Sequence, residues 1–91
     1  SYISPAAQLV LEGKKEAAEF LMNHGASICY VLIAAALVND KPYLEVLLKR
    51  PGAHIKYAVM GAAMLGHKND AFVLSLIKRK ADINYAVKGV A

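Results

Sequence analysis

Apolar residues fall into two kinds of segment that alternate along this chain. One kind is rich in small side chains, as in residues 34–36 and 61–63. The other kind carries larger side chains, many of them three or four residues apart, as in residues 44–48 and 72–77. These spacings place side chains on one face of a helix. We therefore expect helix pairs, each with a short first helix lined by small residues and a bulkier second helix.

Residues that cap or end helices stand between these segments. Ser4 is expected to cap the first helix of the chain, and Asp40 and Asn69 stand close before two of the expected second helices. Gly25 and Gly52 follow two of the second helices. Glycine adopts the left-handed backbone that ends many helices, so we expect the two glycines to end these helices.

Several independent features recur with one period of 27 or 28 residues. They include tyrosines, isoleucines, runs of small residues and loop triplets such as Gly-Ala-Ser at 25–27. The tyrosines are expected to begin the first helices, over about 30–38 and 57–65, and to line up along one edge. The recurring tyrosines are Tyr2, Tyr30, Tyr57 and Tyr85, and the isoleucines are Ile28, Ile55 and Ile83.

The period divides the chain into repeat units. We expect units at about 2–29, 30–56 and 57–84 and a partial fourth unit at 85–91, together one all-α domain over 1–91. One helix pair cannot enclose its own apolar face, whereas neighbouring pairs can do so by stacking. Because the chain ends inside an expected first helix, we expect a fragment of a longer protein, with an apolar carboxyl-side edge through which it could self-associate.

Two segments carry a resemblance to a known family. Residues 13–27, GKKEAAEFLMNHGAS, are similar to the second helix and following loop of ankyrin repeats, and residues 62–67, AAMLGH, are similar to that family's paired alanines and Gly-His. The resemblance implies a solenoid of helix-turn-helix units that binds other proteins.

The sequence also departs from the ankyrin pattern. Its period is shorter than the family's repeat of about 33 residues, and the family's Thr-Pro-Leu-His motif is absent. Only eight residues separate Ala26 from Ala34, too few for the family's β-hairpin. We therefore expect an ankyrin-like helical-repeat solenoid of about three units with the β-hairpins reduced or absent. Short repeats of this kind resemble those of large bacterial effector proteins, which implies secretion into a host cell.

Composition narrows the class of protein. Hydrophobic residues make up 57% of the chain and charged residues 20%, so the chain is not disordered by composition. A net charge of +4 slightly favours acidic partners. Cys29 is the only cysteine, which excludes an internal disulfide and fits a reducing, cytoplasmic-type compartment. The longest apolar run has 11 residues, so we expect no transmembrane segment, which needs about 20.

The residues with potential for catalysis are isolated. His67 follows a glycine in an expected turn, and it lies 13 residues from His54, which is itself 30 residues from His24. These distances do not resemble zinc-ligand spacing. Cys29 has no orienting group apparent in the sequence. We therefore expect no catalytic residue, no metal site and no cofactor, and a chain that is not an enzyme.

Charged residues form two kinds of group on the expected second helices. Residues 12–19 hold three glutamates among two lysines, and we interpret this group as a solvated helix face. Lys49-Arg50 and residues 78–80 fall at the ends of second helices, where a cation and the helix dipole interact favourably by about 0.3–1 kcal/mol. Alternatively they form a basic ridge for an acidic protein, a phosphate backbone or anionic lipid. No aromatic residues interleave with them, so we do not expect nucleic-acid binding.

The tyrosine edge is the preferred candidate for binding a partner, because tyrosine is enriched at the centres of interfaces. The predicted partner-binding residues are Tyr30, Lys56, Tyr57, Asn84, Tyr85, Arg50, Lys78 and Arg79. We expect a non-catalytic protein–protein interaction module of a larger protein, with an acidic protein as one kind of partner and no small-molecule substrate. The alternative is a structural spacer that supports a catalytic domain elsewhere in the parent chain.

Overall fold

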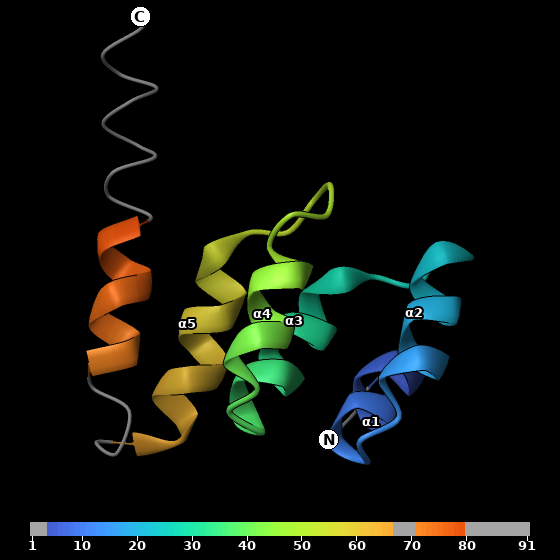
Figure 1. Ribbon diagram of the computed structural model, residues 1–91, viewed down its shortest axis with the longest axis horizontal. Helices are drawn as coiled ribbons and strands as arrows, with labels where there is room; N and C mark the ends of the chain where they lie inside the picture. The colour runs from blue at the N-terminus through green and yellow to red at the C-terminus, as the bar shows by residue number, and fades with distance from the viewer. Residues whose placement is uncertain (1–3, 67–70, 80–91) are drawn as a thin grey trace, which may run out of the picture.

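All regular structure in the described part of the chain is helical. The computed structural model describes residues 4–66 and 71–79, and no β-strand occurs in these ranges (Figure 1). Residues 71–79 form a helical segment after α5. The earlier helices are α1 (Pro5–Leu11), α2 (Lys15–Asn23), α3 (Ile28–Leu37), α4 (Lys41–Leu47) and α5 (Ile55–Met64). The prediction of an all-α chain is confirmed for these residues.

Side-chain caps fix where three of the helices begin. The Ser4 hydroxyl accepts a hydrogen bond from the amide of Ala7, and the Asp40 carboxylate accepts one from the amide of Tyr43, each at 3.2 Å. Both caps were predicted. Ser27 also caps α3, where its hydroxyl accepts from the amide of Cys29, and this cap was not among those predicted. Asn69 lies outside the described residues.

Helices α3 and α5 begin shortly before the tyrosines that were predicted to start them. Helix α3 begins at Ile28 and α5 begins at Ile55, two residues before Tyr30 and Tyr57 respectively. For Tyr30 and Tyr57, the prediction that the tyrosines begin the first helices is therefore wrong by two residues, while Tyr2 and Tyr85 lie outside the described residues. A serine side chain satisfies a free amide in the first turn, so α3 starts directly after it.

The two glycines predicted to end helices behave differently. Gly25 has a φ of 103° and lies two residues after the end of α2, as predicted. Gly52 also has a positive φ, 78°, but α4 already ends at Leu47. Pro51 prevents the helix from continuing to Gly52, because proline lacks an amide hydrogen and disfavours helical backbone in Arg50, the residue before it. Gly52 thus closes the turn after α4, and the prediction that it ends the helix is wrong.

The first helices form a row in which α3 lies between α1 and α5. Helix α2 packs against α1, and α4 packs against α3 (Figure 1). The contact between α3 and α5 is especially close at Gly61. A Cβ atom there would lie 2.4 Å from the carbonyl oxygen of Ile33 and 2.8 Å from the Cβ of Ala36. Small residues in the first helices thus permit neighbouring first helices to approach closely.

The second helices supply three of the five largest fully buried side chains among the described residues. Complete burial of such a side chain contributes about 1.5–3 kcal/mol before the entropy cost is counted. The largest fully buried side chains are Leu32, Leu44, Leu47, Leu76 and Val31. Three of these five come from α4 and the helical segment 71–79, as the sequence pattern predicts.

Charged side chains connect α2 to α4 along the outer layer. The Arg50 guanidinium, in the turn after α4, donates to Glu19 of α2 at 2.8 Å. The Tyr43 hydroxyl donates to the other oxygen of the same carboxylate, also at 2.8 Å. The Lys15 ammonium lies 5.4 Å from the centre of the Tyr43 ring. We call this group of contacts the first junction.

The same arrangement connects α4 to the helical segment 71–79. The Arg79 guanidinium donates to Glu45 at 2.7 Å, and the Lys41 ammonium lies 5.1 Å from the centre of the Phe72 ring. We call this group the second junction. In each junction a lysine and a glutamate four residues apart meet an aromatic residue and an arginine seven residues apart. The contacts between neighbouring second helices therefore repeat along the chain.

Candidate functional site

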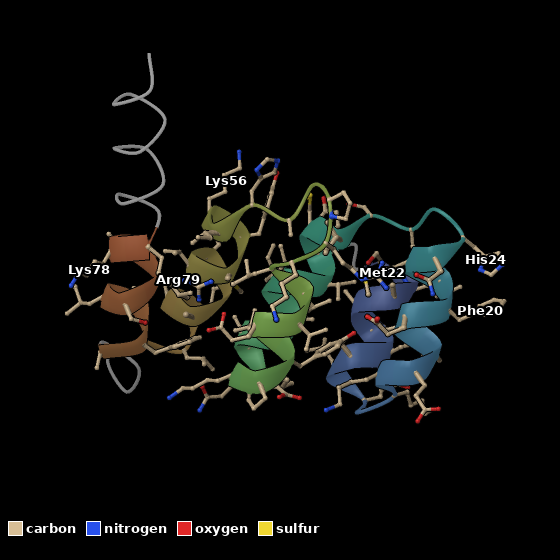
Figure 2. All side chains as sticks on the ribbon, turned by 45° about the horizontal axis from the view of Figure 1, so that its top comes forward. Phe20, Met22, His24, Lys56, Lys78 and Arg79 are labelled. Carbon is tan, nitrogen blue, oxygen red and sulfur yellow. The ribbon has the colours of Figure 1, made fainter. Side chains whose placement is uncertain are left out.

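The first turns of α3 and α5 bring aromatic and basic side chains together. Tyr30 projects from α3 and is 47% exposed. In α5, the Lys56 ammonium lies 5.2 Å from the centre of the half-buried Tyr57 ring. The exposed His54 precedes α5, and its ring centroid is 6.4 Å from that of Tyr57. We call Tyr30, His54, Lys56 and Tyr57 the tyrosine edge. Figure 2 shows Lys56 projecting from the amino-terminal end of α5.

The Cys29 side chain of α3 affects the ionisation of Tyr57 in α5. Hydrogen bonding with the Cys29 side chain raises the pKa of the Tyr57 hydroxyl, and the nearby Tyr30 acts in the same direction. Tyr57 therefore keeps its proton throughout the physiological range and presents a neutral hydroxyl. The tyrosine edge combines apolar ring surface, a hydroxyl and a cation, which are suited to binding a protein surface.

The remaining residues predicted for the tyrosine edge, Asn84 and Tyr85, lie outside the described residues. His67 also lies outside them, so the turn predicted for it is not described.

The two arginines of the predicted basic ridge are bound to glutamates within the junctions. Arg50 is bound to Glu19 and also donates to the Asn23 side chain at 3.0 Å, and Arg79 is bound to Glu45. Lys78 is exposed, and Figure 2 shows it pointing away from α5 while Arg79 points toward it. The two arginines therefore act mainly between helices, which leaves the lysines as the more accessible cations.

Glu19 has a different environment from the one predicted for it. The sequence predicts a solvated face for this glutamate, whereas its side chain is 32% exposed and accepts from both Arg50 and Tyr43. Partial burial opposes its ionisation, but the two hydrogen bonds outweigh this and lower the pKa of the carboxyl. The signal for this role is the recurrence of a lysine and a glutamate four residues apart at 15–19 and 41–45.

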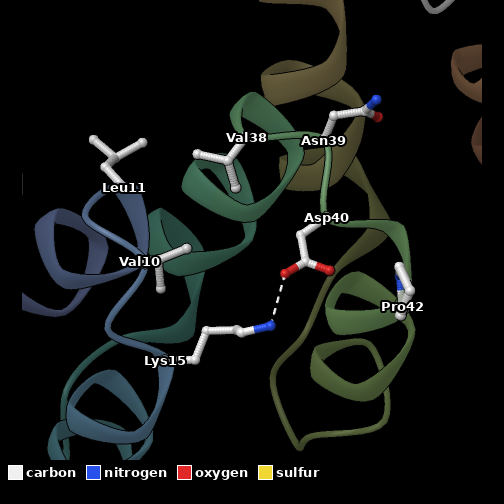
Figure 3. Close-up of a pocket in the computed structure, with 8 residues that line it drawn as sticks. Val10, Leu11, Lys15, Val38, Asn39, Asp40 and Pro42 are labelled. Carbon is white, nitrogen blue, oxygen red and sulfur yellow. Dashed lines mark hydrogen bonds and ion pairs between the residues drawn. The ribbon is translucent and has the colours of Figure 1, made fainter.

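A second candidate site is an open hollow of about 400 Å³ between the ends of α1 and α3 (Figure 3). Within its lining the Lys15 ammonium donates to the Asp40 carboxylate at 3.0 Å. This hydrogen bond lowers the pKa of Asp40, which remains ionised and paired at neutral pH. The hollow is lined by Val10, Leu11, Gly13, Lys15, Val38, Asn39, Asp40 and Pro42. It can accept a small apolar group, but its lining contains no hydroxyl, thiol or imidazole nucleophile.

His24 packs at the carboxyl end of α2. The Nδ1 atom of His24 lies 2.8 Å from the Phe20 carbonyl oxygen, and the two rings stack with centroids 4.2 Å apart (Figure 2). Within residues 4–66 and 71–79, no group of three or more histidine, cysteine or acidic side chains could hold a metal ion.

In the same part of the chain, no helix has the length and apolar character needed to cross a membrane.

No protein-family model, curated protein or solved structure matches this chain.

Proposed function

We propose that this chain is a non-catalytic protein-binding module of a larger protein, built as a short ankyrin-like stack of about three helix pairs. The row of α1, α3 and α5 supports this proposal. The repeated junctions also support it, because equivalent side chains make equivalent contacts at successive positions. A stack of this kind presents a rigid surface and binds without a large ordering cost.

The tyrosine edge is the surface that we assign to the partner. The observation that carries this assignment is that the exposed Tyr30 and the Lys56–Tyr57 pair lie in the first turns of two first helices, α3 and α5, that pack against each other. Tyrosine offers a large contact area with few rotatable bonds, and its hydroxyl can hydrogen-bond at the rim. The lysine beside it favours an acidic partner surface.

The test compares tyrosines at this edge with an exposed aromatic residue elsewhere. A partner recovered with the wild-type chain is titrated against Tyr30→Ala, Tyr57→Ala and the control Phe20→Ala. Phe20 is 60% exposed on α2. We expect each tyrosine variant to weaken binding by about tenfold or more, or about 1.4 kcal/mol, and Phe20→Ala to leave it unchanged. Unchanged affinity in both tyrosine variants, with helix content retained, would remove this edge from consideration.

A spacer between other domains is the second candidate function. The two junctions favour it, because a lysine–aromatic contact and an arginine–glutamate pair join each second helix to the next and stiffen the stack. Replacing the stack in the parent protein by a flexible linker of equal span tests this function. A spacer predicts loss of the neighbouring domain's activity with every binding partner retained, whereas a binding module predicts loss of a partner.

A further inference from the structure

The two junctions contain the same kinds of contact but differ at the aromatic residue. In the first junction the Tyr43 hydroxyl donates to Glu19, while the Tyr43 ring lies beside the Lys15 ammonium. In the second junction Phe72 takes the corresponding place beside Lys41, and phenylalanine has no hydroxyl. The first junction therefore holds a hydrogen bond that the second cannot form.

The two glutamates show the effect of this difference. Glu19 accepts with both carboxylate oxygens, from Arg50 and from Tyr43, each at 2.8 Å. Glu45 is its equivalent in the second junction, and among the described residues it accepts with one oxygen, from Arg79 at 2.7 Å. The other oxygen of Glu45 thus corresponds to the one that the tyrosine hydroxyl binds in the first junction.

The ion pairs of the two junctions also differ in their exposure to water. The side chains of Arg50 and Glu19 are 25% and 32% exposed, whereas those of Arg79 and Glu45 are 43% and 60% exposed. Water and salt weaken an exposed ion pair more than a partly shielded one. The second junction therefore joins its two helices less strongly than the first.

The second junction joins the segment 71–79 to α4. In a stack, each unit contacts only its neighbours, so one element can separate while the rest stays folded. The segment also buries Leu76, which is 1% exposed, and packs Phe72 and Val73 against the core. Separation of the segment uncovers these three apolar side chains and leaves the first junction in place.

We propose that the segment 71–79 separates from α4 in a local opening while α1 to α5 stay folded, and that the absence of a hydroxyl at Phe72 makes this opening frequent. The opened chain is a minor state with an apolar helix face that the closed chain lacks. Local openings of this kind supply the moving parts of proteins. This inference goes beyond the proposed binding function and does not depend on the tyrosine edge.

Amide hydrogen exchange, followed residue by residue by NMR on the full chain, measures such an opening. Helix α3 is the reference, because it lies between α1 and α5 at the centre of the row. We expect the amides of residues 75–78 to be protected at least ~tenfold less than those of α3. Tyr43→Phe removes the hydroxyl from the first junction, which stays intact in the local opening. It should speed exchange in α3 by at least ~threefold and leave exchange at 75–78 unchanged.

Phe72→Tyr supplies the missing hydroxyl to the second junction. It should slow exchange at residues 75–78 by at least ~threefold, because the new hydroxyl can donate to the second oxygen of Glu45. The control is the same substitution in a Glu45→Ala background, where the acceptor is absent and Phe72→Tyr should have no effect. This double-mutant comparison separates the hydrogen bond from any other effect of the tyrosine.

Three results would overturn the proposal. The first is equal protection of residues 75–78 and α3. The second is a Tyr43→Phe variant in which exchange speeds up equally in both places, since the described helices would then open as one unit. The third is a Phe72→Tyr variant that leaves exchange at 75–78 unchanged, or that slows it just as much without Glu45. Circular dichroism of each variant checks that helix content is retained.

Discussion

The guanidinium of Arg50 donates a hydrogen bond of 2.8 Å to the carboxylate of Glu19, 31 residues earlier in the chain. The other carboxylate oxygen accepts from the Tyr43 hydroxyl, so one glutamate of α2 holds two side chains of the next helix pair. Both members of the ion pair are partly shielded from water, with exposed fractions of 25% and 32%. This shielding makes the contact stronger than a typical pair on the open surface.

Removal of this carboxylate should destabilise the fold. Glu19→Ala leaves the Tyr43 hydroxyl and the Arg50 guanidinium without their shared acceptor, and we expect a loss of about 1–2 kcal/mol in the free energy of unfolding. Urea denaturation measures the loss. Glu16→Ala, at an exposed position of the same helix, is the matched control and should change stability by less than about 0.5 kcal/mol. Similar losses in the two variants would contradict a structural role for the first junction.

Stability should fall on acidification because of the same group. The pKa of Glu19 is lowered in the folded chain, so the ionised carboxylate stabilises the fold above its unfolded-state pKa of about 4.3. This contribution is lost as the pH falls through the lower native pKa. The free energy of unfolding, measured by urea denaturation between pH 6 and pH 3, should therefore decline more steeply in the wild type than in Glu19→Gln. Parallel profiles would show that Glu19 does not contribute to this dependence.

The stability of the fold should also decrease at alkaline pH, because of Tyr43. Burial and the hydrogen bond to Glu19 raise the pKa of its hydroxyl above the ordinary value of about 10. The folded chain therefore retains this proton where the unfolded chain releases it, and the stabilisation disappears as the pH rises above about 10. We expect wild-type stability to fall more steeply than that of Tyr43→Phe between pH 9 and pH 11. Since both proteins contain the same lysines, a common slope would exclude the tyrosine as the cause.

Gly61 should be intolerant of even one added methyl group. In a helix interior, replacing glycine with alanine normally stabilises by about 1 kcal/mol. Here the new Cβ would meet the Ile33 carbonyl oxygen and the Ala36 Cβ, so Gly61→Ala should destabilise by about 1–3 kcal/mol instead. The reverse substitution at the exposed Ala63 of the same helix, Ala63→Gly, should cost only the propensity term of about 1 kcal/mol. Thermal unfolding decides the sign, and a stabilised Gly61→Ala would refute the close contact.

Adjacent residues of α4 provide a test of the core. Leu47 is 0% exposed and Val46 is 53% exposed. Truncation of the leucine removes buried contacts and leaves a cavity, so Leu47→Ala should cost about 2–5 kcal/mol. Val46→Ala should remain within about 0.5 kcal/mol of the wild type. Chemical denaturation of the two variants measures the difference, and equal effects would place the core elsewhere.

Local features of the sequence predicted much of the secondary structure. Ser4 and Asp40 were expected to cap helices and do so, since a capping side chain bonds to an amide only two or three residues away. Other local expectations were wrong. Helix α3 begins two residues before Tyr30 because Ser27 caps it, and α4 ends at Leu47, well before Gly52. Ser27 decided the first of these ends, and Pro51 prevents α4 from continuing as far as Gly52.

The sequence by itself determined the helical character of the described residues and the division between helices with small side chains and helices with large ones, because both follow from residue type and short-range spacing. Only the tertiary structure decided which charged side chains meet across the outer layer. Glu19 and Glu45 occupy an ordinary helix surface in the sequence, yet their partners stand 31 and 34 residues away. The hollow beside Lys15 and Asp40 likewise depends on two chain segments 25 residues apart. Such contacts depend on how whole helices lie against one another, and short-range spacing does not encode that geometry.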